Sequence, residues 1–91
     1  MATLNFQDTA TEFRVKIVGG FTGGVVAEVQ RFWRTAANEE GRRFAVDIST
    51  MAGYDAAGCA LLRTMSRHGV KIVAGTPQSL IFLSEISRTA A

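Results

Sequence analysis

The sequence has few cysteines and no long apolar runs, the features that disulfide-bonded, zinc-binding and membrane-spanning proteins need. Cys59 is its only cysteine, so no disulfide can form within the chain and no cysteine cluster can bind zinc. No apolar run is long enough to cross a bilayer. The first residues show no basic segment followed by an apolar one, as a secretory signal would. We therefore expect a cytoplasmic protein that reaches a membrane only by binding another protein.

The chain also lacks a concentrated charge of either sign. Ten Lys or Arg residues stand against eight acidic ones, a net charge of +2. The basic residues are scattered from Arg14 to Arg88, and Arg42 and Arg43 are the only adjacent pair. A nucleic-acid-binding protein more often gathers such residues on one face, so we expect no nucleic-acid partner. A hydrophobic content of 47% in 91 residues predicts one folded domain, residues 1–91.

Hydrophobic periodicity predicts an α/β fold with the order β-β-α-β-α-β-α. The expected strands are residues 4–8, 12–18, 44–48 and 70–74, and the expected helices are 23–38, 56–68 and one opening at Thr76-Pro77. Thr22 is expected to cap the first helix and Gly41 to end it, residues 49–54 to form a loop, and Gly69 to terminate the second helix. Alternating strands and helices favour a mostly parallel sheet, with the first two strands as an antiparallel hairpin at its edge.

A glycine-rich segment, residues 19–24, precedes the first predicted helix. A phosphate loop requires Lys and then Ser or Thr after its last glycine, but Gly24 is followed by Val25 and Val26. The dinucleotide pattern G-x-G-x-x-G is also absent. Amides at this helix start could hold an anion weakly. A flexible turn is the favoured interpretation, and a nucleotide site is the alternative.

Asp47, near the end of a predicted strand, and Asp55, just before a helix, are the carboxylates best placed for chemistry. A carboxylate pair at this edge could perform acid–base catalysis or bind magnesium. Asp55 is equally suited to cap the helix, and Asp47 to accept hydrogen bonds from loop amides. We favour these structural roles because no third ligand or partner base lies nearby in sequence.

Three single residues, His68, Cys59 and Trp33, are further candidates for a catalytic, metal or binding role. His68 ends a helix, where positive charge is favourable. Cys59 lies in a first helical turn, which stabilises a thiolate, but burial as a small apolar residue is favoured. Trp33, flanked by Arg31 and Arg34, could stack on a base, although a core position is favoured. The sequence therefore predicts no catalytic residue, no metal, no cofactor and no enzymatic activity.

Residues 44–62 read FAVDISTMAGYDAAGCALL, which resembles the signature of STAS domains, the family of anti-sigma factor antagonists and sulfate-transporter tails. Asp47 matches the aspartate at the end of the family's strand. Asp55 and Gly58 match the two ends of its Asp-Ser/Thr-x-Gly motif. Residues 15–21 and 70–75 carry weaker matches, so the resemblance covers nearly the whole chain and agrees with the predicted order of elements.

One departure from the family concerns regulation. The resemblance places the family's phosphorylated Ser or Thr on Ala56, which has no hydroxyl. A phosphate there would add nearly two negative charges to a docking surface, so this switch cannot operate. Either the protein is permanently able to bind or it is controlled elsewhere. Tyr54, Ser49 and Thr50 carry hydroxyls nearby, but none occupies the matching position.

A second departure is length, because one helix follows residues 70–74 where typical antagonists continue with another strand and helix. This short form resembles the small STAS subunit of Mla-type lipid-transport ABC transporters. The resemblance therefore implies one of two protein partners, an anti-sigma kinase or a transporter ATPase.

We expect a non-catalytic regulatory domain, similar to anti-sigma factor antagonists, that binds a protein partner through the start of the second helix. The residues predicted to form this surface are Tyr54, Asp55, Ala56, Ala57, Gly58, Arg63 and Arg67. Two alternatives stay open. The chain could sense a nucleotide or other small ligand at residues 19–24, or form a homodimer through the sheet face that carries Arg14 and Lys16.

Overall fold

The computed structural model describes residues 3–37 and 43–88. Within them the chain forms strands and helices in the predicted order β-β-α-β-α-β-α. The strands are β1 (Thr3–Asp8), β2 (Glu12–Phe21), β3 (Arg43–Tyr54) and β4 (Lys71–Val73); the helices are α1 (Gly23–Ala37), α2 (Ala56–Arg67) and α3 (Pro77–Arg88). The end predicted for the first helix, at Asn38 and Gly41, lies outside the described residues.

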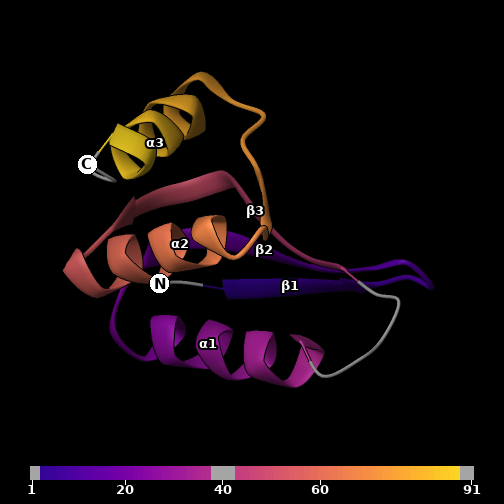
Figure 1. Ribbon diagram of the computed structural model, residues 1–91. Coiled ribbons are helices and arrows are strands. Elements are labelled where there is room, and N and C mark those ends of the chain that lie inside the picture. The colour runs from indigo at the N-terminus through magenta and orange to yellow at the C-terminus, as the bar shows by residue number, and fades with distance from the viewer. Residues whose placement is uncertain (1–2, 38–42, 89–91) are drawn as a thin grey trace.

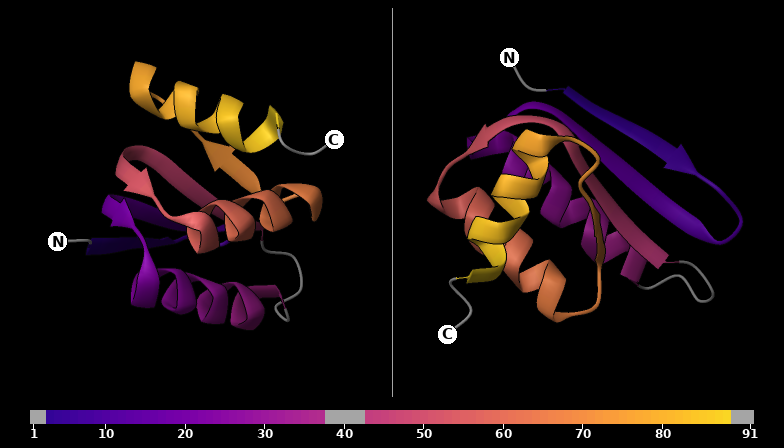
Figure 2. Two further views of the ribbon diagram at one scale, coloured as in Figure 1. Left: turned by 90° about the vertical axis from the view of Figure 1, so that its left-hand side faces the viewer. Right: turned by 90° about the horizontal axis from the view of Figure 1, so that it is seen from above.

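The four strands form one sheet in the order β1-β2-β3-β4. β1 is antiparallel to β2, and the β2–β3 and β3–β4 pairs are parallel, which confirms the predicted α/β topology. Both crossovers move along the sheet in the same direction, so right-handed connections place α1 and α2 on one face. Figures 1 and 2 show these two helices side by side, with α2 between α1 and α3.

The register of β2 against β3 explains which face carries the core. Phe13 pairs with Phe44 and Val15 with Val46, so the alternating apolar residues of both strands face the helices together. Arg14 lies on the opposite face and forms an ion pair with Glu12 at 2.9 Å. The buried core consists of Val15, Ile17, Phe21, Val26, Val29, Phe44, Val46, Ile48, Met51, Leu61, Leu62, Met65, Phe82 and Ile86.

Two strands, β2 and β3, continue several residues past their predicted ends. The predicted loop over 49–54 is wrong, because β3 continues to Tyr54. The glycine segment is likewise a turn only in part, since β2 continues through Gly19 and Gly20 to Phe21. Two register shifts between these strands interrupt the period-two pattern, and Gly19 takes a φ of 92°. Such bulges hide a strand from a periodicity argument while its hydrogen-bonded ladder continues.

The end of α2 follows the prediction. Gly69 adopts the left-handed conformation with a φ of 84° directly after the cap residue His68. The amide of Gly69 donates to the carbonyl of Ser66 at 3.1 Å, and that of Val70 to Met65 at 3.0 Å. These two bonds form a Schellman motif, which satisfies carbonyls that the helix leaves unpaired. The chain is thereby turned sharply into β4.

The start of α3 also follows the prediction, with Thr76 as cap and Pro77 as first residue. The amide of Ser79 donates to Thr76 Oγ1 at 3.2 Å, and the amide of Thr76 to Ser79 Oγ at 2.9 Å. The Thr76 hydroxyl also donates to the carbonyl of Ser49 in β3 at 3.0 Å. This cap therefore fixes where α3 begins relative to the sheet.

Candidate docking surface at the start of helix α2

The predicted surface lies where β3 ends and α2 begins. α1 and α2 each follow one of two parallel strands, so both helices begin at the same edge of the sheet (Figure 1). In open α/β sheets the carboxyl ends of the strands are where binding sites gather. The edge therefore brings two helix N-termini and the residues around Asp55 into one region.

Asp55 caps both of these helices. Its Oδ1 accepts a hydrogen bond from the amide of Gly58 at 2.7 Å, in α2. Its Oδ2 accepts one from the amide of Gly23 at 3.2 Å, at the start of α1. The first bond confirms the predicted N-cap, and its backbone is extended as a cap requires. The bond from Gly58, then that from Gly23, lowers the pKa of the Asp55 carboxyl below its ordinary value near 3.8.

The bond from Gly23 shows that the start of α1 is capped by Asp55 and not by the Thr22 side chain alone. Thr22 was the predicted cap, and its carbonyl accepts the amide of Val25 at 3.1 Å. The Gly23 amide is instead taken by Asp55, a residue from a distant part of the sequence. Gly23 has a φ of 53°, a left-handed conformation that glycine adopts without strain. This carboxylate also places negative charge where a phosphate would bind, which argues against the alternative of a nucleotide site at residues 19–24.

Gly58 is buried, and its role is close packing rather than exposed surface. A Cβ at this position would lie 2.4 Å from the carbonyl oxygen of Phe21 and 3.0 Å from its ring. That carbonyl also accepts the amide of Asp55 at 3.4 Å. The glycine thus lets the first turn of α2 rest against the end of β2, which sets the position of the residues before it.

Ala56 and Ala57 form the exposed tip of this region. They are the first two residues of α2, and both are exposed to solvent. Neither side chain carries charge or a hydrogen-bonding group. Ala56, the residue on which the resemblance places the family's phosphorylated side chain, is thus exposed. The tip is small, neutral and held in place by Asp55 behind it.

Tyr54 is directed away from the tip and toward α3. Its hydroxyl donates to Glu85 Oε1 at 2.5 Å, and its ring meets Phe82 edge-on, with centroids 5.4 Å apart. The bond to Glu85, followed by partial burial and the charge of Glu85, raises the pKa of Tyr54 to about 12. Tyr54 therefore links the end of β3 to α3 and is half-buried.

The two arginines of the predicted surface lie one helical turn apart on α2 but differ in their surroundings. Arg63 is half-buried against α3: its Nε donates to the carbonyl of Ile86 at 3.4 Å and its Nη2 to Cys59 Sγ at 3.2 Å. Arg67 is exposed at the far end of α2, roughly 16 Å along the helix axis from Ala56. The structure thus gathers residues 54–58, while Arg67 belongs to a different region. Cys59 is half-buried against the core.

Asp47 takes the structural role favoured from sequence. Its Oδ1 accepts a hydrogen bond from the amide of Ser49 at 2.9 Å. Among the residues that the structure describes, no group of three or more His, Cys, Asp or Glu side chains is arranged to hold a metal ion. None of the described helices is long and apolar enough to cross a membrane.

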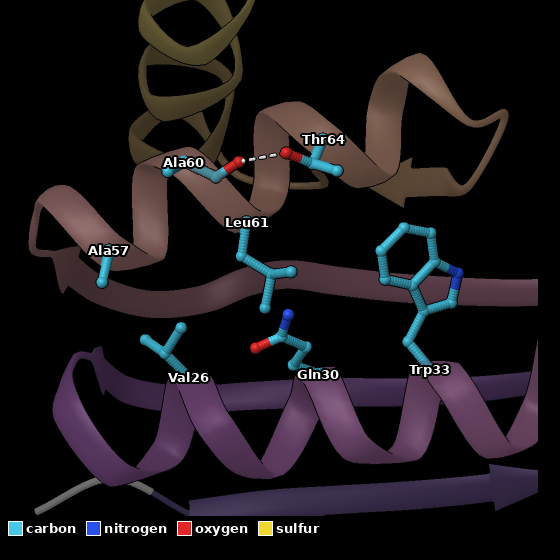
Figure 3. A pocket seen from close by; sticks show the side chains of 7 residues that line it. All are labelled: Val26, Gln30, Trp33, Ala57, Ala60, Leu61 and Thr64. Atoms are coloured by element: carbon cyan, nitrogen blue, oxygen red, sulfur yellow. Dashed lines mark hydrogen bonds between the residues drawn. The ribbon is translucent and has the colours of Figure 1, made fainter.

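A groove between α1 and α2 was not foreseen. It has a volume of about 320 Å³, and Figure 3 shows Val26, Gln30 and Trp33 of α1 pointing toward α2, with Leu61 of α2 pointing back toward α1. It is lined by Val26, Gln30, Trp33, Ala57, Ala60, Leu61 and Thr64. The small residues of α2 at positions 57, 60 and 64 recur at helical spacing, a signal that could have revealed it. The groove begins beside the tip at Ala57 and continues to Trp33, which is half-buried as part of the core's margin.

Comparison with known proteins shows that this chain shares its fold with several solved structures. No protein-family model matches the sequence, and no curated protein matches it significantly. Among solved structures, the unphosphorylated anti-sigma factor antagonist SpoIIAA aligns with a TM-score of 0.57 at 12% identity, over 93% of this chain and 98% of that one. The chain has a STAS-like, SpoIIAA-like fold.

Two further structures share the SpoIIAA-like fold of this chain to a similar degree. An uncharacterised DUF3478-family protein from Shewanella loihica, itself described as SpoIIAA-like, aligns with a TM-score of 0.58 at 14% identity, over 96% of this chain and 77% of that one. Mglu aligns with a TM-score of 0.59 at 15% identity, over 81% of this chain. The chain spans only 19% of the length of Mglu. At these identities the likeness is one of fold.

Proposed function

We propose that this chain is a non-catalytic regulatory domain that binds a protein partner through the tip formed by Ala56 and Ala57. The observation that carries the proposal is the exposure of two neutral alanines at the head of α2, held by the double cap of Asp55. Small uncharged side chains let a partner approach the helix start closely. The SpoIIAA-like fold supports this choice of function.

Ala56 determines whether this site can be regulated by phosphorylation. An anti-sigma factor antagonist of this fold that is controlled at this position needs a hydroxyl to phosphorylate, and Ala56 has none. The tip therefore keeps its neutral surface at all times. We propose that binding is constitutive at this site and that any control acts on the partner.

The partner we propose is an anti-sigma kinase, with the ATPase of a lipid-transport ABC transporter as the alternative. The groove between α1 and α2 extends the tip, since Ala57 contributes to both. Exposed Arg67, at the far end of α2, is available to an acidic group of a partner that covers the whole helix. A partner limited to the tip would not reach it.

The test is affinity capture from the native host with the wild-type chain and with Asp55→Lys, each fixed to a resin. We expect the wild-type chain to retain a kinase or an ATPase, whose identity decides between the two partners. Asp55→Lys should lose it, because lysine cannot cap either helix and adds positive charge beside the tip. Recovery of neither class, with no difference between the two resins, would refute the proposal.

One of the two open alternatives, a nucleotide sensor, is tested by calorimetry with guanine and adenine nucleotides. We expect no binding tighter than about 10 μM, because the Gly23 amide is already bonded to Asp55. Tighter binding that persists in the Asp55→Lys variant would favour the sensor.

A further inference from the structure

Within residues 3–37 and 43–88, no strand pairs with the outer edge of β1. β1 is the terminal strand of the sheet, and it pairs with β2 along its whole length, from Thr3 opposite Val18 to Asp8 opposite Phe13. No other described strand pairs with it. Natural proteins usually protect such an edge with lysine, proline or a bulge. β1 reads TLNFQD, which contains none of these residues, and its pairing with β2 has no register shift.

An exposed aromatic pair lies at this same edge. Phe6 of β1 is 43% exposed and Phe32 of α1 is 37% exposed, and their ring centroids are 4.6 Å apart. Phe6 pairs with Val15 in the register, so it lies on the face that α1 covers. The cluster continues inward to Phe13, whose ring centroid is 6.0 Å from that of Phe6. Single exposed apolar residues are ordinary, whereas this contacting pair places apolar area directly beside the open strand edge.

We propose that a second copy of this chain pairs its β1 with this edge, antiparallel and about a two-fold axis, with Phe6 opposite Phe6 of the other copy. Residues directly opposite each other in an antiparallel pair share a face. This register therefore keeps both α1 helices on one side of a continuous sheet. Phe6 and Phe32 of the two copies then close into one aromatic cluster.

The sequence of β1 suits pairing with itself. In this register Asn5 faces Gln7 of the other copy and Leu4 faces Asp8. Asp8, the one charged residue of β1, is thus kept away from its own counterpart, so no like charges oppose each other. A register shifted by one residue would place the two α1 helices on opposite faces of the sheet and leave both aromatic pairs exposed.

The area involved indicates a weak, reversible dimer. With about 200 Å² for a phenylalanine, the exposed parts of Phe6 and Phe32 in two copies sum to roughly 320 Å². Stable interfaces bury about 1,200–2,000 Å² in total. Strand pairing and the flanking residues of α1 must supply the rest, so we expect a Kd on the order of 10–100 μM.

Sedimentation of the full chain from about 1 to 500 μM tests the proposal, over a range that brackets the expected Kd. The wild-type mass should rise from monomer to dimer. Phe6→Glu and Phe32→Glu should each raise the Kd at least tenfold, about 1.4 kcal/mol of association free energy. Ile81→Glu is the matched control, since Ile81 is 53% exposed on α3, and it should leave the Kd unchanged. Circular dichroism shows that each variant is folded.

Cross-linking tests the register. In a Cys59→Ser background, Phe6→Cys should oxidise to a disulfide-linked dimer, because opposite positions lie within disulfide reach. Asn5→Cys should react far more slowly, because its nearest counterpart is offset along the strand. A chain that stays monomeric at every concentration, a Kd that responds to Ile81→Glu but not to Phe6→Glu, or equal cross-linking at positions 5 and 6 would overturn the proposal.

Discussion

Oδ2 of Asp55 accepts a hydrogen bond from the amide of Gly23 at 3.2 Å, across 32 residues of sequence. The same carboxylate caps its own helix through Gly58. One side chain therefore holds the starts of two helices in a fixed relation. The exposed tip at Ala56 and Ala57 depends on this arrangement, because it determines where α2 begins.

Replacing Asp55 should separate these two bonds. Asp55→Asn retains one acceptor oxygen and can cap only one helix, whereas Asp55→Ala caps neither. We expect Asp55→Ala to lower the thermal midpoint by roughly 5 °C or more and Asp55→Asn to lower it by an intermediate amount. Thermal unfolding followed by circular dichroism measures both. An unchanged midpoint for Asp55→Asn would mean that one of the two bonds contributes nothing to stability.

The same residue predicts a dependence on pH. The pKa of Asp55 is lower in the folded chain than its ordinary value near 3.8, so the ionised carboxylate stabilises the fold. This contribution is complete above the ordinary pKa and is lost as the pH falls through the lowered one. The stability difference between wild type and Asp55→Asn should therefore shrink between pH 6 and pH 2, as measured by urea unfolding. A constant difference over that range would contradict this prediction.

Gly58→Ala should destabilise the fold by about 1–3 kcal/mol. The new Cβ would meet the Phe21 carbonyl at 2.4 Å, and backbone cannot move aside as easily as a side-chain tip. Gly24→Ala is the matched control, because Gly24 is also in a first helical turn but has no atom within 4 Å of the added Cβ. We expect that change to be neutral or stabilising by up to about 1 kcal/mol. Urea unfolding compares the two, and equal effects would show that the contact with Phe21 is not limiting.

The phenol of Tyr54 should ionise at a higher pH than an ordinary tyrosine. It is the only tyrosine, so its absorbance near 295 nm reports its titration without overlap from another phenol. The pKa of about 12 results first from the bond to Glu85, and Glu85→Gln should lower it by about one unit. Because the folded pKa exceeds the ordinary value of 10.0, this stabilisation is complete below pH 10 and is lost as the pH rises toward 12. A midpoint near 10 in the wild-type chain would contradict the observed hydrogen bond.

The order of elements was predictable because each strand or helix carries its own periodicity and its own terminators. Asp55 as cap, Gly69 as left-handed terminator and the Thr76–Pro77 helix start are all local features, and the structure confirms them. The extension of β3 to Tyr54 was not predictable in this way. A bulge changes the face of every later residue, so residues 49–54 lose the alternation that identifies a strand.

Contacts between residues far apart in the sequence could not be predicted from local patterns either. The Gly23 bond to Asp55 and the Arg63 bond to the Ile86 carbonyl join residues whose proximity depends on the whole packing of α1, α2 and α3. Arg63 was predicted to face a partner, yet it is half-buried against α3. The aromatic pair of Phe6 and Phe32 likewise follows from how α1 crosses the sheet edge rather than from either local pattern.

The central claim, that the tip of α2 binds the partner, is tested most directly by calorimetry with the captured partner against Ala56→Ser, Ala56→Glu and the control Ser84→Glu on α3. An acidic residue in a first helical turn stabilises the helix, so weaker binding by Ala56→Glu cannot be attributed to unfolding. We predict at least a tenfold loss of affinity for Ala56→Glu and less than a twofold change for Ala56→Ser and Ser84→Glu, about 1.4 kcal/mol against 0.4 kcal/mol or less. Unchanged affinity for Ala56→Glu would contradict the claim.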